Sequence, residues 1–328
     1  MTRAGFLAVT MAIAVALTQQ TASAQAMGQA RLWDEPGPCD RSCLIDLANQ
    51  YVAALVAHDP GNASLADEVR FTENTALLEV GEGLWQTASG GPTDFQIYVP
   101  DPVSRMVGYF GVMEAEGAPI ELGLRLAINE DGEITEAEHM VISNLTENGL
   151  ENLQTPRPGL LPTDLLANSE RLAREILLVI GQTYYDAIEL SDGDATLFAD
   201  DCLRRENGMT SAGGIGRSGQ LRQGCNEQLD TRFMSYINSI DLRRVWIADE
   251  ETGLVFGISQ FRHPQEDRTL DIYDADGRLT ERDMTQYDPF DMPAMHIFKI
   301  RGGKISEIEA MGFMTPYMSP SGWNPHLR

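Results

Sequence analysis

The 328-residue sequence has few basic residues. Lysine and arginine together number 24, against 49 aspartates and glutamates, which gives a formal net charge of −25. A surface this acidic repels nucleic acid and anionic membranes. The composition therefore predicts no nucleic-acid partner, and solubility explains the charge more simply than a specific cationic partner does.

Motifs for metal, nucleotide and covalent chemistry are also lacking. The five histidines form no H-x-H or H-E-x-x-H pattern, the cysteines form no C-x-x-C pair, and no G-x-S-x-G elbow is present. We therefore expect no metal, no cofactor and no serine or cysteine nucleophile. Gly214, Gly216 and Gly219 satisfy G-x-G-x-x-G, but no hydrophobic strand of a βαβ unit precedes them, so they predict a flexible loop.

Long apolar runs are absent beyond the N-terminus, where no segment has about eighteen uninterrupted apolar residues. At the N-terminus itself, Arg3 precedes the apolar run Gly5–Leu17, and small-x-small patterns end at Ala24 and Ala26. This arrangement is typical of a signal peptide, here residues 1–26. We therefore expect a secreted or periplasmic protein with no membrane contact after cleavage.

The four cysteines favour disulfides, because an even number in an oxidising compartment is typical of a disulfide framework. Three pairings are possible. We favour Cys39–Cys43 and Cys202–Cys225, since each bridge then stays within one domain. A metal site is the weaker alternative, because no histidine cluster accompanies the cysteines.

Part of the sequence occurs twice. Tyr51–Asn74 aligns without a gap with Tyr184–Asn207, and Ile134–Met140 (ITEAEHM) matches Ile305–Met311 (ISEIEAM). Two matches in the same order indicate a duplication. The identical positions in the longer match are Tyr51/Tyr184, Ala54/Ala187, Asp59/Asp192, Ala66/Ala199, Asp67/Asp200, Glu73/Glu206 and Asn74/Asn207.

Each copy is predicted to begin with a helix and to continue as a run of strands, which indicates an α+β fold. The expected helices cover 41–57 and 169–190. The expected strands are 95–99, 107–114, 121–128 and 133–142 in the first copy, and 242–248, 254–263, 294–300 and 304–311 in the second. Because 153–163 is rich in proline, we expect domains at 27–150 and 169–328 joined by a linker at 151–168.

Several motifs resemble the nuclear-transport-factor-2-like (SnoaL-like) superfamily. The resemblance is carried by helices that end in an H/S-D turn and by the closing strands that begin at Ile134 and Ile305. An uncharacterised family of exported bacterial and fungal proteins is similar at CDRSCL (Cys39), FTEN (Phe71), GEGLW (Gly81), RREN (Arg204), HIFKIRGGKISEIEA (His296) and PYMSPSGW (Pro316). The resemblance implies two tandem cone-shaped units, each with helices packed on a curved antiparallel sheet around a conical apolar pocket. It implies no single chemistry, because folds of this kind host many functions.

A glutamate and an asparagine occupy the same place in both copies, as Glu73-Asn74 and Glu206-Asn207. A carboxylate there could act as a general base if the cone buries it and raises its pKa. The alternative is a structural carboxylate bonded to backbone amides. The duplication favours that alternative, since both copies of a site rarely stay catalytic.

Two arginine pairs, Arg204-Arg205 and Arg243-Arg244, lie in the second copy. Strand alternation sends one member of each pair inward, where it could clamp a carboxylate group of a ligand. An internal salt bridge, to Glu206 or a neighbouring aspartate, is the favoured interpretation in so acidic a protein.

Histidine and aromatic residues complete the candidate site. His263 ends a predicted strand and could border the second pocket, and imidazole is a natural acid or base at neutral pH. The catalytic candidates are thus Glu206, Arg244 and His263. The pocket candidates, beside the two Glu-Asn pairs, are Trp85, Tyr98, Tyr236 and Trp323, although such aromatics more often pack the core. The tail 316–323 either covers the mouth of the second cone or extends its sheet.

Three functions remain open at this point. The first is a cofactor-independent lyase, isomerase or hydrolase acting on a small apolar or carboxylate-bearing molecule. The second is a non-catalytic protein that binds such a molecule. The third is a structural or interaction module, in which the cones pack against each other or into a homo-oligomer. The second copy has more arginine, histidine and aromatic candidates, so we expect the functional pocket there.

Overall fold

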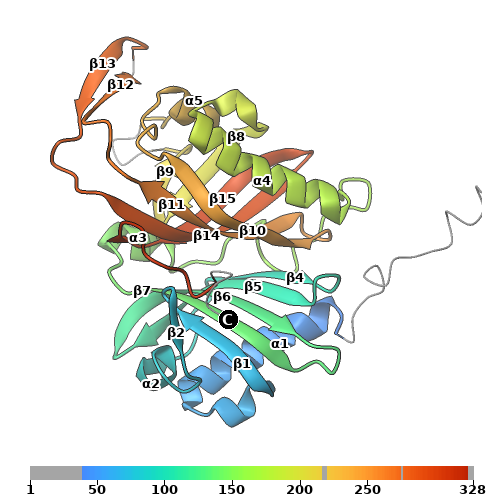
Figure 1. Ribbon diagram of the computed structural model, residues 1–328. Coiled ribbons are helices and arrows are strands. Elements are labelled where there is room, and N and C mark those ends of the chain that lie inside the picture. Colours follow the sequence, from blue (N-terminus) through green and yellow to red (C-terminus); the bar gives the residue numbers. More distant parts are fainter. Residues whose placement is uncertain (1–38, 216–219, 275, 324–328) are drawn as a thin grey trace, which may run out of the picture. The chain divides into compact units, whose positions relative to one another are not determined.

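Two seventeen-residue helices, α1 (Arg41–Ala57) and α4 (Arg174–Leu190), each lead into a β-sheet (Figure 1). The computed structural model describes residues 39–215, 220–274 and 276–323. The expected signal peptide lies outside these residues, as do Gly216 and Gly219 of the glycine-rich motif.

Local signals set the ends of both helices. α1 starts where the Asp40 carboxylate accepts a hydrogen bond from a backbone amide of the first turn, and it ends at His58 in the left-handed conformation. α4 ends in the same way at Ser191. Its first residue is Arg174 rather than the predicted Ser169, because the intervening residues form a turn and an irregular segment.

An aspartate follows each helix and organises the next turn. The Asp59 side chain accepts a hydrogen bond from the amide of Gly61 and caps a 3₁₀ turn at Pro60–Asn62. Asp192 does the same for the amide of Asp194, at Gly193–Ala195. The helix and turn at the start of the sequence repeat are therefore also repeated in the structure.

The first sheet has seven strands in the order β2-β1-β7-β6-β5-β3, with β4 also paired to β5. Two short helices, α2 (Leu84–Thr87) and α3 (Glu147–Asn152), follow β2 and β7. The strands are β1 (Leu65–Glu73), β2 (Ala76–Leu78), β3 (Ala88–Gly90), β4 (Gln96–Asp101), β5 (Met106–Ala115), β6 (Ala118–Ile128) and β7 (Ile134–Ile142).

The second sheet also has seven strands, in the order β10-β11-β14-β15-β8-β9, with β16 paired to β14. A helix, α5 (Cys225–Asp230), precedes β10, and a separate hairpin, β12–β13, lies between β11 and β14 in the sequence. The strands are β8 (Phe198–Glu206), β9 (Met209–Ala212), β10 (Ser239–Asp249), β11 (Leu254–His263), β12 (Thr269–Tyr273), β13 (Leu279–Asp283), β14 (Phe290–Arg301), β15 (Lys304–Gly312) and β16 (Thr315–Pro316).

Each sheet is mixed, which corrects the predicted purely antiparallel sheets. β1 runs parallel to β7, with Glu73 opposite His139, and β8 runs parallel to β15, with Glu206 opposite Ala310. The first strand after each long helix thus pairs with the last long strand of the same half. Such a pairing joins residues far apart in the chain, and no local pattern reveals its direction.

Three apolar clusters hold these layers together. α1 covers the first sheet through Leu44, Tyr51 and Leu55, and α4 covers the second sheet through residues that include Tyr184 and Tyr185. A third cluster contains buried residues from both sheets, mainly from β4, β5, β7, β11, β14 and β15. The sheets therefore pack against each other on the faces that the long helices leave free.

Small residues allow this close packing between the sheets. Phe110 of β5 and Phe256 of β11 meet edge to face, with ring centroids 5.9 Å apart. A Cβ on Gly108 would lie only 2.4 Å from the Phe256 ring, so a larger residue there would force the sheets apart. The two sheets are thus partners in one packed structure.

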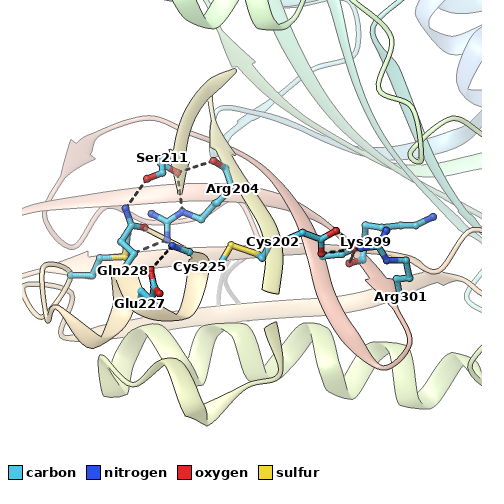
Figure 2. Close-up of a disulfide and its surroundings, with 12 residues drawn as sticks. Cys202, Arg204, Ser211, Cys225, Glu227, Gln228, Lys299 and Arg301 are labelled. Carbon is cyan, nitrogen blue, oxygen red and sulfur yellow. Dashed lines mark hydrogen bonds and ion pairs between the residues drawn. A yellow bond between two sulfur atoms is a disulfide. The ribbon is translucent and has the colours of Figure 1, made fainter. Parts of the chain in front are cut away.

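Both predicted disulfides are confirmed. Cys39–Cys43 joins the residue before α1 to its first turn, and Cys202–Cys225 joins β8 to α5 (Figure 2). Within the described ranges, no cluster of three or more histidine, cysteine or acidic side chains is arranged to hold a metal ion. No helix among the described residues has the length and apolar character needed to cross a membrane.

Candidate functional site

A cavity of about 160 Å³ lies inside the second half of the chain, between α4 and the second sheet. Its walls come from α4, the end of β8, the segment before β10, and β11, β14 and β15. The lining residues are Tyr184, Ile188, Glu206, Asn207, Met234, Tyr236, Ile237, Phe261, His263, Met292, Ala294, His296, Ala310, Met311 and Gly312. Four of the sequence candidates, Glu206, Asn207, Tyr236 and His263, are therefore brought together.

Glu206 is the acidic side chain of this cavity. One carboxylate oxygen, Oε1, lies 2.7 Å from Nη2 of Arg204, whose side chain is buried. The Glu206 side chain itself is about half exposed, at 49%. The predicted salt bridge between an arginine of the first pair and Glu206 is therefore confirmed.

The segment between Cys202 and Cys225, which the second disulfide closes, holds the Arg204 side chain in place. Its Nε donates a hydrogen bond to Oγ of Ser211 at 3.0 Å, and Gln228 of α5 donates to the Ser211 carbonyl oxygen (Figure 2). Burial alone would lower the pKa of Arg204, but Glu206 outweighs it and holds that pKa above its usual value. Arg204 therefore stays charged and holds Glu206 at the cavity.

His263 is held flat between two aromatic rings. It stacks on Phe290 with centroids 4.0 Å apart and on Tyr236 with centroids 5.4 Å apart. Burial lowers its pKa to about 4, against a weaker opposing effect of nearby backbone groups. Its Nδ1 has no hydrogen-bond partner among the residues that the structure describes. At neutral pH, His263 is therefore an uncharged imidazole.

A second histidine, His296, reaches the cavity from β14. Its Nδ1 lies 3.2 Å from the hydroxyl of Tyr185. Burial, with the nearby Arg204 charge, lowers the pKa of His296 to about 3. Burial also raises the pKa of Tyr184 to about 12, although Arg204 opposes the shift. The cavity therefore contains neutral rings beside a single ion pair.

The two asparagines of the repeated Glu-Asn pair have a structural task. Asn207 adopts a left-handed conformation, and its side-chain amide donates to the carbonyl of Gly312 and accepts from the amide of the same residue. Asn74 makes the same two bonds with Val141. Each side chain therefore continues the parallel strand pairing beyond the point where the backbone turns away.

The two glutamates have different surroundings. Oε2 of Glu73 accepts a hydrogen bond from the amide of Leu84 at 2.8 Å and lies 3.2 Å from Nδ1 of His139. His139 in turn lies 3.0 Å from the Tyr51 hydroxyl, and Trp85 packs edge-on against Tyr51. Side chains thus fill the first half around Glu73, which has the structural role that the duplication favours.

One aligned position explains why only the second half opens at this point. His139 of β7 faces Glu73 across the parallel strand pair, and Ala310 of β15 faces Glu206 in the same register. A methyl group therefore replaces an imidazole, and Ala310 lines the cavity. The difference was visible in the repeat, where ITEAEHM aligns with ISEIEAM.

Arg244 lies outside this cavity and binds an acidic residue of the other sheet. Its guanidinium makes two 2.6 Å hydrogen bonds to the carboxylate of Glu138 in β7, which Arg125 also contacts at 3.1 Å. Burial alone would raise the pKa of Glu138, but the two arginines outweigh it and lower that pKa. The pairing occupies Arg244 with a structural ion pair between the sheets, which removes the case for a catalytic role.

Trp323 also lies elsewhere, next to the first sheet. β16 extends the second sheet as one alternative predicted, but the tail then continues to β1, where Trp323 Nε1 donates to Oγ1 of Thr72 at 2.9 Å. The guanidinium groups of Arg70, Arg125 and Arg244 lie 4.5–5.3 Å from its ring centroid. The tail therefore connects the two sheets and does not cover the second cone.

The remaining aromatic candidates lie in the first half. Trp85 is buried against Tyr51, and the Tyr98 hydroxyl lies 2.6 Å from Oδ1 of Asn49 and 2.7 Å from Oε1 of Gln96. Neither lines the cavity. His296, which does line the cavity, was not among the predicted site residues, although strand alternation places it on the same face of β14 as the buried Phe298.

Comparisons with known proteins leave the activity open. Residues 170–312 match a family model described as a domain of unknown function, DUF8021. A search of curated proteins finds no match. The similar solved structures include a protein described as a polyketide cyclase from Xanthomonas campestris pv. campestris, with 18% identity, coverage of 42% of this chain and 90% of that chain, and a TM-score of 0.25.

Two further solved structures are similar over comparable lengths. An NTF-2 like protein of unknown function from Burkholderia xenovorans LB400 has 15% identity, coverage of 45% of this chain and 90% of that chain, and a TM-score of 0.26. A protein described as a ketosteroid isomerase from Kribbella flavida DSM 17836 has 12% identity, coverage of 47% and 89%, and a TM-score of 0.24. Such low identities carry no activity over to this chain.

The strand order gives the fold directly. The first sheet begins β2-β1-β7-β6-β5, and the second sheet, read from its other end, begins β9-β8-β15-β14-β11. In both, the strand after the long helix therefore lies beside the last long strand, and the hairpin strands follow. In each half the long helix packs on one face of the sheet. Each half therefore has the α+β architecture that its motifs predict.

Proposed function

We propose that the chain is a small-molecule-binding protein whose ligand occupies the cavity beside Glu206. The observation that carries this proposal is the exchange of His139 for Ala310 at equivalent positions, which leaves Glu206 at an open cavity while Glu73 is enclosed. A buried cavity of roughly 150 Å³ with apolar walls can accept a molecule the size of benzene. The proposed ligand is therefore a small ring or one end of a larger apolar molecule.

Methionine side chains in the cavity wall can report the binding of a ligand. Met234 and Met292 line it, whereas Met113 lies in the core of the first half. In protein with ¹³C-labelled methionine methyl groups, small cyclic probes should shift the signals of these two lining methionines and leave that of Met113 unchanged. Unchanged signals from both at saturating probe concentrations would contradict the proposal.

A second candidate function is cofactor-independent proton transfer, as in an isomerase, cyclase, lyase or hydrolase. It is favoured by Glu206, a carboxylate that shares the cavity with the uncharged imidazoles of His263 and His296. A positioned general base contributes about 10²–10⁴-fold to a rate. Glu206→Gln should therefore reduce the turnover of any substrate at least 100-fold, by the lower end of that range; turnover retained at the wild-type rate would remove Glu206 from the chemistry.

The proposal extends to the organisation and export of the chain. We place a signal peptide at 1–26, and two tandem units at 27–150 and 169–328 joined by a linker at 151–168. The shared strand order and the matching asparagine bonds of the two halves support a duplication, and the two disulfides suit an extracytoplasmic compartment. N-terminal sequencing of the protein recovered outside the cytoplasm tests the cleavage site; a chain that keeps residues 1–26 would refute it.

A further inference from the structure

The charge at the cavity determines which ligands it can hold. Among the residues that the structure places on its walls there is no lysine or arginine. Arg204 stands behind Glu206, and its guanidinium contacts Glu206, Ser211 and the sulfur of Met234. An anionic ligand would therefore meet a carboxylate at the cavity and no free cation to pair with it.

The histidines do not change this balance. Burial lowers the pKa of His263 to about 4 and that of His296 to about 3, so both rings are uncharged at neutral pH. Arg204 already neutralises Glu206 at 2.7 Å, and the guanidinium of Arg282 lies 5.6 Å from the ring centroid of the wall residue Tyr236. A cationic ligand would lose its hydration and would also face the charge of Arg204.

The Glu206 carboxylate can still accept a hydrogen bond from a ligand. Its Oε1 contacts Arg204, but the side chain is about half exposed. The carboxylate of Glu73, in contrast, has the Leu84 amide and His139 within hydrogen-bond distance of its Oε2. The second half therefore offers a charged hydrogen-bond acceptor where the first half has used it internally.

The walls around this acceptor are apolar. Ile188, Met234, Phe261 and Met292 surround a space of about 160 Å³. Such walls favour an apolar ring, and methionine side chains adapt to its outline. The size and polarity of the cavity thus favour an uncharged, ring-sized ligand, as the charge at the cavity also does.

We infer that the ligand is an uncharged, ring-sized molecule that donates a hydrogen bond from a hydroxyl group to the carboxylate of Glu206. This inference rests on the proposed binding function and adds the chemical class of the ligand. Its ring lies against the apolar part of the wall, and its hydroxyl group points to Glu206. The charge at the cavity favours this class over the carboxylate-bearing ligands that the sequence left open.

Four probes of similar size test this inference: benzyl alcohol, ethylbenzene, benzoate and benzylammonium. Dissociation constants are measured at neutral pH on the full mature chain from the shifts of the Met234 and Met292 methyl signals. Benzyl alcohol should bind more tightly than either charged probe. Glu206→Gln should weaken benzyl alcohol about tenfold, because it removes a hydrogen bond to a charged group, and should leave ethylbenzene unchanged.

The same variant makes a prediction for the anion. Glu206→Gln frees Arg204, so benzoate should bind more tightly to the variant than to the wild type. Glu73→Gln is the matched control, because Glu73 is the aligned residue of the first half and does not line the cavity. It should leave all four dissociation constants unchanged.

The outcomes distinguish a wrong ligand class from a failure of the binding function. If benzoate or benzylammonium binds wild-type protein more tightly than benzyl alcohol, or if Glu206→Gln leaves benzyl alcohol unaffected, the ligand class is wrong while the binding function stands. If none of the four probes shifts the lining methionines, the binding function itself fails.

Discussion

Exchanging the aligned residues His139 and Ala310 tests the difference between the two halves. His139→Ala removes two contacts. Nδ1 of His139 lies 3.2 Å from the Glu73 carboxylate, and Nε2 lies 3.0 Å from the Tyr51 hydroxyl. Each is worth about 1 kcal/mol, and the buried Tyr51 hydroxyl left behind costs about 1–3 kcal/mol more. The free energy of unfolding should therefore fall by about 3–5 kcal/mol.

The reverse exchange, Ala310→His, should affect binding rather than stability. The new imidazole enters an existing cavity and faces Glu206 in the register in which His139 faces Glu73. We expect the free energy of unfolding to change by less than about 1 kcal/mol, and benzyl alcohol to lose its site.

Urea denaturation followed by circular dichroism measures the stability of both variants, and methionine methyl spectra measure the binding. Two results would refute the reasoning. One is a loss below about 1 kcal/mol for His139→Ala, which is no more than a single hydrogen bond contributes. The other is full affinity for benzyl alcohol in Ala310→His, which would place the ligand elsewhere.

Three further predictions concern stability. Trp323→Ala should lower the free energy of unfolding by about 3 kcal/mol, because three arginines lose the ring that they contact. An unchanged urea midpoint would show that the contacts of Trp323 do not stabilise the fold. Replacing Cys202 and Cys225 together by alanine should cost about 3 kcal/mol for a 23-residue separation, and differential scanning calorimetry of the oxidised and variant proteins should show the matching fall in Tm. Burial, with the nearby Glu309 carboxylate, raises the pKa of Glu121 well above its usual 4.5, so the folded state prefers the protonated form and loses stability as the pH rises above that value. Glu121→Gln removes this loss, so its stability advantage should grow as the pH rises above 4.5, whereas a constant difference would show that Glu121 does not titrate as argued.

The features that local sequence determines were predictable. The start of α1 at Asp40, its end at His58, and the disulfide Cys39–Cys43 all depend on residues within one or two turns of each other. The longer bridge, Cys202–Cys225, could be predicted because the alternatives would have joined separate domains. For these features the chain needs no information from distant segments.

The candidate site was predictable only in part, because distant segments decide it. Glu206 and His263 were placed correctly at one pocket, since the repeat and a strand end indicated them. Arg244 makes an internal salt bridge, as was favoured for the arginine pairs, but its partner, Glu138, lies 106 residues away on the other sheet and was not predicted. The place of Trp323 was not predicted for the same reason, since its contact with Thr72 spans 251 residues. The alternation of side chains along one strand does not reveal contacts between residues this far apart in the sequence.

The contact between the tail and β1 has a consequence for how the chain is made. Arg70 donates to the carbonyl of Gly322, and the Gly322 amide donates to Thr75, so residues near position 322 touch a strand that leaves the ribosome some 250 residues earlier. That strand cannot reach its final surroundings until the residues near position 322 have been synthesised. Until the tail arrives, the arginines that will contact Trp323 stay open to solvent and to any chaperone that recognises unfinished chains.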